Sequence, residues 1–168
     1  GKKHTIYSLM YDMIIVSSNL ATNLIIELVD AKQVSATMRS IGAQDMQILR
    51  GVEDTKAFEA GLNNKVTAYD LMLLFEKIDG EELVNDEASM AMMDILLDQR
   101  FNEIIPAQLP NNIKVAHKTG SIIGVQHDSG IVFLPDGRKY ILVLLSKDLK
   151  DAETGVEALA TVSEMIYH

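Results

Sequence analysis

The stretch IKVAHKTGS, residues 113–121, decides the fold because the hydrophobic period of the chain changes there from helical to extended. Residues 113–118 predict a strand that runs into a Lys-Thr-Gly sequence. A second strand is predicted over residues 130–134, and the Pro-Asp-Gly-Arg sequence at residues 135–138 is a strong turn signal. A third strand follows over residues 140–146. Three consecutive strands of this kind predict an antiparallel meander.

Helical spacing dominates the chain before the meander. Apolar residues recur three and four positions apart in three successive stretches, residues 6–14, 20–28 and 34–41. Thr67 followed by Asp70 predicts a capped helix start, with Gly80 at the helix end. The inward stripe of the next predicted helix consists of Met90, Met93, Leu97 and Phe101. The inward stripe of a last helix, after the meander, consists of Ala152, Val156, Leu159, Val162 and Ile166.

Residues 44–65 lack this spacing and predict a long loop with one helical turn. A loop of this length inside a compact domain is usually either functional or wrongly assigned as a loop. We therefore predict a single α+β domain over residues 1–168. Its residues 1–110 are mainly helical and include the long loop, and its residues 111–168 form three antiparallel strands and a C-terminal helix.

The third predicted strand looks too hydrophobic for the edge of a three-stranded sheet. Its continuous apolar run over residues 140–146 predicts burial on both faces, yet the meander leaves this strand at an edge. An uncovered edge of this type invites pairing with another chain. We expect either that further strands of the sheet lie outside this chain, or that two copies pair through this edge.

Composition excludes several classes of function. The 168 residues are 48% hydrophobic, and 24 acidic against 15 basic residues give a net charge of −9, so nucleic acid is a poor partner. There is no cysteine, and the four histidines at positions 4, 117, 127 and 168 lack metal-ligand spacing, so no metal or cofactor is expected. No apolar run is long enough to cross a membrane, and the N-terminal Gly-Lys-Lys-His does not resemble a signal peptide.

Two short motifs carry chemistry. Lys118-Thr119-Gly120-Ser121 places an ammonium and a hydroxyl at a strand end, where they suit a ligand carboxylate, although a solvated strand end gives the same pattern. Ser17-Ser18-Asn19 joins two predicted helices, where a hydroxyl and an amide can relay a proton and hold a substrate amide. Ser and Asn are also the residues preferred as helix N-caps, so capping is the alternative.

Together these motifs resemble the S-D-N and K-T-G motifs of class A β-lactamases and penicillin-binding proteins. The flanks are similar too: residues 17–24 resemble the helix that follows S-D-N, residues 50–64 a variant omega loop, and residues 126–132 the strand after K-T-G. The resemblance implies an α/β sandwich with its active site between a helical region and a five-stranded sheet. This chain would supply roughly the last two-thirds of that domain and three of its strands.

The resemblance also implies roles for the first motif. Ser17 would pass a proton to the leaving nitrogen, and Asn19 would hydrogen-bond the substrate amide. Ser18 replaces the acidic middle residue of the motif and would be structural. Asn23 would tie the omega loop to the helix.

Residues of the second motif would bind substrate. Lys118 and Thr119 would recognise the substrate carboxylate, and the charge of Lys118 would act on Ser17. Gly120 and Ser121 would lie on the strand that pairs with the substrate and supplies an oxyanion-hole amide.

Two departures from the family pattern matter. No Ser or Thr is followed by Lys three residues later, so the nucleophile and its Lys are expected upstream of Gly1, and this chain alone is expected to be inactive. The omega loop also lacks a well-placed E-x-x-L-N. Glu53 is the nearest candidate for the deacylating base and Glu59 the next, with a solvated loop acid as the alternative. A missing base would favour a penicillin-binding or peptidase-like member.

The neighbours His127 and Asp128 suggest a Ser-His-Asp arrangement, but adjacent strand residues point to opposite faces, so we expect a turn role for them. The family resemblance implies that the intact protein is exported, to the periplasm or outside the cell, and that it acts on β-lactams or peptide-like amides through an acyl-enzyme. The alternative is a slow or non-catalytic module of the same fold that binds carboxylates.

Overall fold

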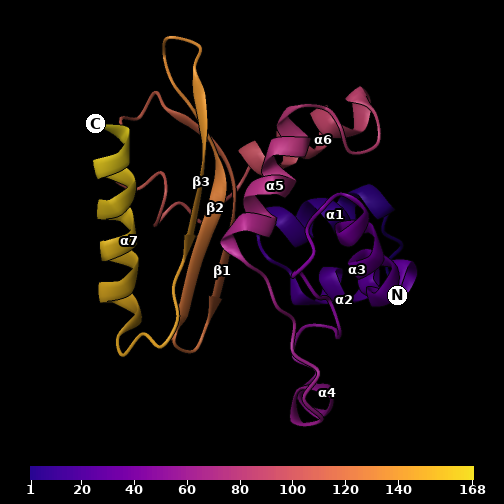
Figure 1. Ribbon diagram of the computed structural model, residues 1–168. Coiled ribbons are helices and arrows are strands. Elements are labelled where there is room, and N and C mark those ends of the chain that lie inside the picture. The colour runs from indigo at the N-terminus through magenta and orange to yellow at the C-terminus, as the bar shows by residue number, and fades with distance from the viewer. The chain divides into compact units, whose positions relative to one another are not determined.

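The computed structural model describes residues 1–168 as two compact units, Gly1–Leu74 and Phe75–His168, and each unit is described by itself. Seven helices and one three-stranded antiparallel sheet confirm the predicted α+β class (Figure 1). The prediction of a single domain over residues 1–168 stays a prediction. The structure contains no helix that is both long and apolar enough to cross a membrane.

The first unit is helical. Its elements are α1 (Ile6–Ile15), α2 (Asn19–Val29), α3 (Ala31–Ser40), the short α4 (Thr55–Glu59) and the start of α5 (Ala68–Asp79). The first three helices agree with the predicted stretches because each begins at a side chain that caps it. Thr5, Ser18 and Asp30 each accept a hydrogen bond from a backbone N–H in the first turn of the helix that follows.

The long loop of this unit has the single helical turn that the sequence predicts, which is α4. Its two ends are joined by an antiparallel bridge between Gln47 and Lys65. Between them the Asn64 side chain accepts from the N–H groups of Leu49 and Arg50, at 2.8 and 3.2 Å, and donates to the Arg50 carbonyl. Side-chain amides thus replace the regular hydrogen bonds that a loop lacks.

Helix α5 begins where the sequence predicts. Thr67 Oγ1 accepts from the Asp70 N–H at 3.1 Å and donates to the Asp70 carboxylate at 2.8 Å. Helix α6 (Asp86–Leu97) is shorter than predicted, and the inward positions of Met90 and Phe101 are wrong. Met90 is 60% exposed, and Phe101 lies beyond the helix end because Gln99 Oε1 binds the next two backbone N–H groups.

The sheet consists of β1 (Lys114–Ile122), β2 (Val125–Phe133) and β3 (Lys139–Leu145), hydrogen-bonded in that order. Strand β2 begins five residues before the predicted start, so the β1–β2 turn is tight and Ile122 pairs with Val125. The edge position of β3 is confirmed, but burial on both of its faces is wrong, because Leu142 and Leu144 are buried and alternate with half-buried neighbours. Pairing of two copies there stays a prediction.

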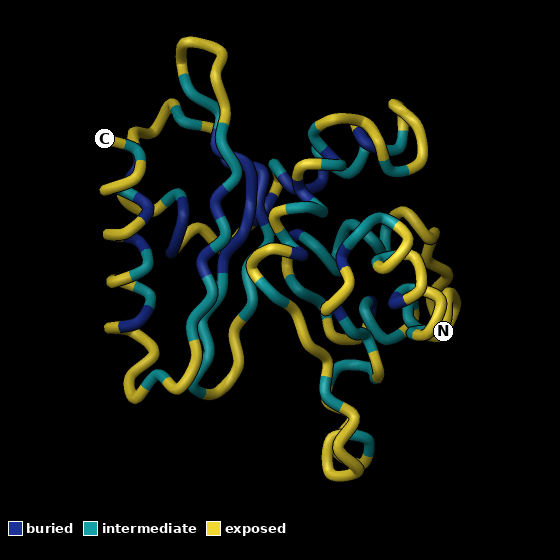
Figure 2. Tube along the Cα trace, in the orientation of Figure 1, coloured by how far each residue is buried: buried dark blue, intermediate teal, exposed yellow.

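Helix α7 (Ala152–Tyr167) covers one face of the sheet, and α6 packs near β1 (Figure 1). The buried positions of α7 are Gly155, Ala160 and Ser163. Of the predicted stripe, Ala152, Val162 and Ile166 are exposed, so three of its five inward positions are wrong. A Cβ on Gly155 would lie 2.5 Å from Leu149 Cδ1, and Ser163 Oγ donates to the Ile105 carbonyl at 2.9 Å, so small side chains suit both positions. Figure 2 shows burial concentrated in the middle of the strands. The core cluster consists of Ile104, Ile105, Leu109, Val115, Val132, Leu142 and Leu144.

Candidate functional site

The candidate residues form two groups, one in each unit. Ser17, Ser18, Asn19, Asn23 and Glu53 belong to the helical unit, on α1–α2 and on the long loop. The Lys118–Ser121 segment belongs to the second unit and lies on β1. Each group has a geometry of its own.

Within Ser17-Ser18-Asn19, the middle residue is the one that caps the following helix. Ser18 Oγ accepts from the Ala21 N–H at 3.2 Å, which makes Ser18 the N-cap of α2. Ser17 precedes the cap with φ +50°, a conformation that costs a non-glycine residue about 1–3 kcal/mol. Asn19 is the first residue of α2. The capping alternative therefore explains Ser18, but it does not explain the strained backbone of Ser17 or the orientation of the Asn19 side chain.

Asn19 is joined to the long loop through Glu53. Its Nδ2 donates to Glu53 Oε1 at 3.0 Å, across 34 residues of sequence. Glu53 also has a left-handed backbone, with φ +61°. Such strained positions persist only where their surroundings hold them, and they gather at functional sites. Of the two candidate loop acids, it is Glu53 that contacts the motif, whereas Glu59 is an exposed residue at the end of α4.

Asn23 holds the loop residue that precedes Glu53. Its Oδ1 accepts from the Val52 N–H at 2.7 Å, and its Nδ2 donates to the Val52 carbonyl at 3.0 Å. A Cβ on Gly51 would lie 2.6 Å from Asn23 Oδ1, so only glycine lets the loop approach this closely. The backbone on which Glu53 is carried is thus fixed to α2.

On β1, Lys118, Thr119 and Gly120 are half-buried and Ser121 is exposed. Lys118 Nζ donates to the Thr119 carbonyl at 2.6 Å. Burial lowers the pKa of Lys118 below its usual 10.5, and the nearby negative charge of Asp128 opposes that shift. The Ser121 hydroxyl accepts from Gln126 Nε2 on β2 at 3.0 Å. A cation with this partial burial suits a small anion that can displace its remaining water.

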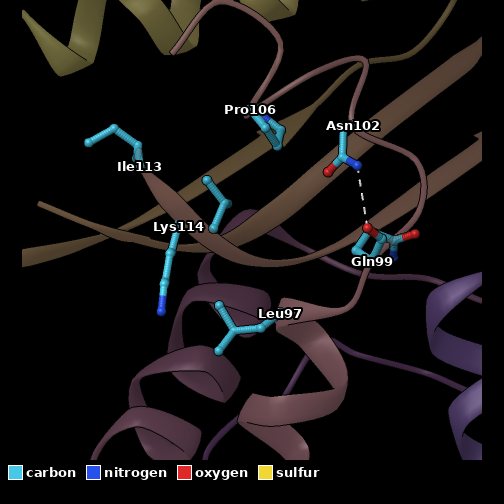
Figure 3. A pocket seen from close by; sticks show the side chains of 7 residues that line it. Leu97, Gln99, Asn102, Pro106, Ile113 and Lys114 are labelled. Atoms are coloured by element: carbon cyan, nitrogen blue, oxygen red, sulfur yellow. Dashed lines mark hydrogen bonds between the residues drawn. The ribbon is translucent and has the colours of Figure 1, made fainter. Parts of the chain in front are cut away.

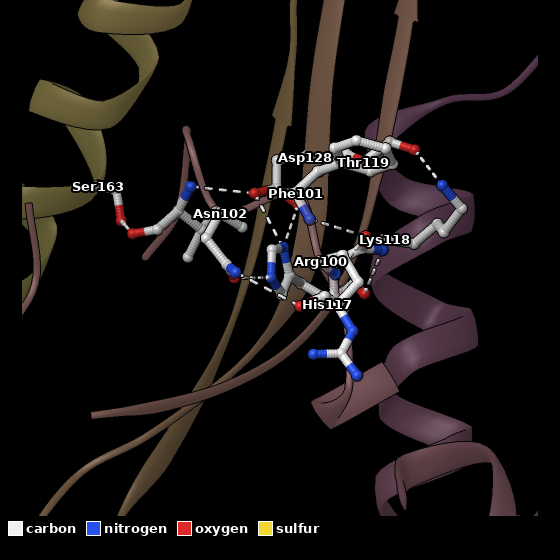
Figure 4. A network of polar contacts seen from close by, with 10 residues as sticks. Arg100, Phe101, Asn102, His117, Lys118, Thr119, Asp128 and Ser163 are labelled. Carbon is white, nitrogen blue, oxygen red and sulfur yellow. Dashed lines mark hydrogen bonds and ion pairs between the residues drawn. The ribbon is translucent and has the colours of Figure 1, made fainter. Parts of the chain in front are cut away.

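Behind this strand lies a polar network that the sequence did not predict (Figure 4). His117 Nδ1 lies 2.8 and 3.0 Å from the two carboxylate oxygens of Asp128, and His117 Nε2 lies 3.1 Å from Asn102 Oδ1. The expected turn role of His127 and Asp128 is wrong, because both lie within β2. They do point to opposite faces, and it is His117 that pairs with Asp128.

The sequence gives only a partial signal for this pair. His117 directly follows the apolar residues Val115 and Ala116, whereas Asp128 stands among polar neighbours, and both are almost completely buried, at 1% and 0% exposure. Charged residues are rarely buried unless they are paired. The pairing partner follows only from the tight β1–β2 turn, which sets Thr119 opposite Asp128 and His117 opposite Gly130.

A cavity of about 360 Å³ opens beside this network (Figure 3). It is lined by Leu97, Gln99, Asn102, Pro106, Ile113, Lys114 and Val115. Gln99 and Asn102 belong to both the cavity wall and the network. No group of three or more His, Asp or Glu side chains is arranged to hold a metal ion.

Comparison with known proteins gives concordant matches. Residues 1–168 match the model of the beta-lactamase enzyme family. A beta-lactamase of Bacteroides uniformis is 30% identical over 121 residues, which are 66% of this chain and 41% of that protein. The solved structure of PBP-A is 28% identical with a TM-score of 0.90, over 99% of this chain and 61% of that one. A beta-lactamase structure from Sphaerobacter thermophilus is 26% identical with a TM-score of 0.88, over 99% and 63%. The chain therefore spans about two-fifths of that curated relative and three-fifths of these solved chains.

Proposed function

The chain belongs to the beta-lactamase enzyme family, and we propose that it supplies the substrate-recognising part of a serine hydrolase that opens β-lactam or related amide bonds through an acyl-enzyme. The observation that carries this proposal is the contact of Asn19 with Glu53, since it joins the Ser17-Ser18-Asn19 motif to a loop carboxylate. A variant of the similar protein PBP-A has been solved as an acyl-enzyme complex with penicillin G. A β-lactam is therefore the first substrate to test.

In the helical unit, the proposed reaction uses Ser17, Asn19 and Glu53. Ser17 passes a proton to the leaving nitrogen when the amide bond breaks. Asn19 holds the substrate side-chain amide, and Glu53 acts as the base that activates water for deacylation. The Asn19–Glu53 hydrogen bond of 3.0 Å would exchange for contacts with substrate and water when a substrate binds.

In the sheet unit, Lys118 and Thr119 receive the substrate carboxylate, and both side chains are half-buried on β1. Gly120 and Ser121 carry the stretch of β1 that pairs with the substrate backbone and offers an amide to the oxyanion. A Cβ on Gly120 would be 3.6 Å from His127, an ordinary contact, so space on the β2 side does not demand glycine there. We infer that glycine serves the close approach of a ligand.

The attacking Ser and its Lys would come from residues outside 1–168, because no Ser or Thr here has Lys three positions later. An unpaired apolar stripe on α2 supports this proposal. Leu20, Leu24 and Leu28 lie four residues apart on α2 and are 72%, 40% and 60% exposed. A helix face of this kind is ordinarily covered by another apolar element. An exported location is proposed on family membership alone.

A second candidate is a penicillin-binding member that acylates and then deacylates slowly. The observation that favours it is the exposed position of Glu53 in a loop without a well-placed E-x-x-L-N. The two candidates differ in the lifetime of the acyl-enzyme. Release of the label within seconds indicates a β-lactamase, whereas a label that persists through gel electrophoresis indicates a penicillin-binding protein.

The test is labelling of the intact protein with a fluorescent penicillin, followed by mass spectrometry of the adduct. We expect one covalent adduct, and we expect Lys118→Ala to slow its formation by roughly a hundredfold. Lys114→Ala is the matched control, because Lys114 is an exposed lysine four residues earlier on the same strand. An intact protein that forms no adduct, or a Lys118→Ala variant that acylates like wild type, contradicts the proposed function.

A further inference from the structure

The buried pair of His117 and Asp128 has no part in the proposed reaction, although it lies directly behind the residues that would bind the carboxylate (Figure 4). Both side chains are buried in an apolar sheet, at 1% and 0% exposure. Burial of two ionisable groups without a compensating role is unfavourable for a fold. Gly130 lets β2 approach β1 closely beside His117, since a Cβ there would lie 2.3 Å from the Ala116 carbonyl oxygen and 2.5 Å from the Cβ of His117.

The hydrogen bonds around the ring show which groups its two nitrogens face. Asp128 Oδ2 accepts from the Ile105 N–H at 2.9 Å, so this carboxylate binds a backbone donor as well as the His117 ring. Asn102 Nδ2 points at the Gln99 carbonyl, at 3.4 Å, which turns Asn102 Oδ1 toward His117 Nε2. Both ring nitrogens of His117 therefore face acceptors. A ring that donates from both nitrogens is an imidazolium.

The same network fixes the segment between α6 and β1. Gln99 Nε2 donates to the His117 carbonyl at 3.4 Å, and Asn102 binds the His117 ring at 3.1 Å. The Ile105 N–H is held by Asp128, and the Ile105 carbonyl accepts from Ser163 of α7 at 2.9 Å. One histidine thus joins β1, β2 and the 99–105 segment at the residue before Lys118.

Asp128 interacts with two basic side chains, His117 and Lys118. It is hydrogen-bonded to His117, and its charge also raises the pKa of Lys118 against the effect of burial. With a neutral His117, the negative charge of Asp128 would act on Lys118 in full, whereas a positively charged imidazolium would offset part of it. The protonation of the ring therefore bears on how strongly Lys118 attracts a substrate anion.

We propose that His117 is a positioning residue for carboxylate recognition, acting as an imidazolium held between Asp128 and Asn102 that fixes Lys118 and Thr119 on β1. The proposal rests on the proposed function, because it concerns the carboxylate that Lys118 and Thr119 would bind. It makes the buried pair a support of the binding strand as well as of the sheet.

The charge of the ring is tested by nitrogen-15 NMR of histidine-labelled intact protein at neutral pH. We expect both ring nitrogens of His117 to carry protons, with His117→Gln used to assign the signals. His4 and His168 are exposed and supply reference signals from solvated rings. A neutral ring with one protonated nitrogen overturns the proposal.

The positioning role is tested by acylation with penicillin G and with its methyl ester, which lacks the free carboxylate. We expect wild type to prefer the acid, and we expect His117→Gln and the milder Asn102→Ala to reduce that preference by about tenfold and about threefold. Ser163→Ala is the matched control, because it removes a buried hydrogen bond to Ile105 without touching the charged pair.

The outcomes separate the two proposals. A wild-type protein that penicillin G does not acylate contradicts the proposed function. A wild type that is acylated, together with His117→Gln and Asn102→Ala variants that keep the full preference for the acid over the ester, contradicts the positioning role alone. A loss of preference in Ser163→Ala equal to that in His117→Gln also overturns the role, since it would reduce it to general stability.

Discussion

The two halves of the candidate site are built in opposite ways. In the helical unit, Ser17 and Glu53 stand in strained backbone conformations near the surface, and side-chain amides of Asn19 and Asn23 hold the loop. In the sheet unit, the motif lies on a regular strand, and its support is the buried charged pair of His117 and Asp128. One half depends on local strain and exchangeable hydrogen bonds, and the other on the register of a sheet.

The difference has a chemical meaning. A group that moves protons and admits water benefits from an exposed, adjustable position, and Glu53 has one. A group that binds a fixed anion benefits from a rigid and partly desolvated position, and Lys118 has one. The helical half is therefore suited to proton transfer and the sheet half to recognition. Substitutions that affect stability and activity differently in the two halves test this division.

The largest expected effect is on stability, from Asp128→Ala. It leaves the buried His117 ring without its charged partner, and losing one partner of a buried pair costs about 3–5 kcal/mol. Glu53→Gln is the contrasting change, since Glu53 is exposed and its loss should change the unfolding free energy little while it slows release of the acyl group. Urea denaturation measures both. Equal losses of stability would remove the distinction between the halves.

The second expected effect separates two glycines of the same hairpin. A Cβ on Gly130 would lie 2.3 Å from the Ala116 carbonyl oxygen, whereas a Cβ on Gly120 meets its nearest neighbour at 3.6 Å. Gly130→Ala must shift the strands and should cost about 3 kcal/mol. Gly120→Ala should keep the unfolding free energy and lose only acylation. If Gly130→Ala is as stable as wild type, the sheet half is less rigid than its register indicates.

How much the sequence could predict follows from the same contrast. The apolar runs of β1 and β3 and the capping side chains gave those elements within a few residues. The hydrophobic pattern missed the first half of β2 because Gln126, His127, Asp128 and Ser129 are polar and suggest a loop, and only the family resemblance of residues 126–132 indicated a strand there. On α7, hydrophobic Val162 and Ile166 were predicted inward, but the close approach to the core selects Gly155 and Ser163. Hydrophobicity alone cannot reveal that preference for small side chains.

For the candidate site, the local motifs were accessible and the long-range partners were not. Spacing and resemblance indicated Ser17, Asn19 and Lys118. The pairing of His117 with Asp128 depends on the cross-strand register, which no local pattern encodes. The choice of Glu53 over Glu59 likewise depends on where the loop returns to α2. Contacts between residues far apart in the sequence are therefore the part of the site that the sequence alone could not predict.

The third prediction concerns the helical half. Asn23→Ala removes both hydrogen bonds to Val52, and two net hydrogen bonds correspond to about 2 kcal/mol. The loop around Glu53 should then exchange its amide hydrogens faster, while the sheet stays protected. Hydrogen exchange with mass spectrometry measures this directly, and Ser40→Ala offers a control, because it removes a side-chain hydrogen bond at the end of α3 and none in the loop. Unchanged exchange at residues 50–54 would contradict a role for Asn23 in holding Glu53.

The smallest expected effect is on the pH dependence of acylation, and it appears only in alkaline solution. Burial lowers the pKa of Lys118 below 10.5, so Lys118 loses its charge, and with it the substrate carboxylate, at a lower pH than an exposed lysine does. Asp128 raises that pKa, so Asp128→Asn should move the alkaline fall in acylation rate to lower pH.

Two comparisons test whether this alkaline fall in acylation rate reports the contact between Lys118 and the substrate carboxylate. Acylation by the penicillin methyl ester should lack this alkaline fall, because the ester has no carboxylate for Lys118 to bind. Asp136→Asn removes one negative charge at an exposed turn, where Asp136 pairs with Arg138, and should leave the fall in place. A fall that moves equally in both variants would show that net charge controls it. A fall that moves only in Asp128→Asn makes the buried pair part of carboxylate recognition, because a purely structural carboxylate would lower the rate at every pH alike.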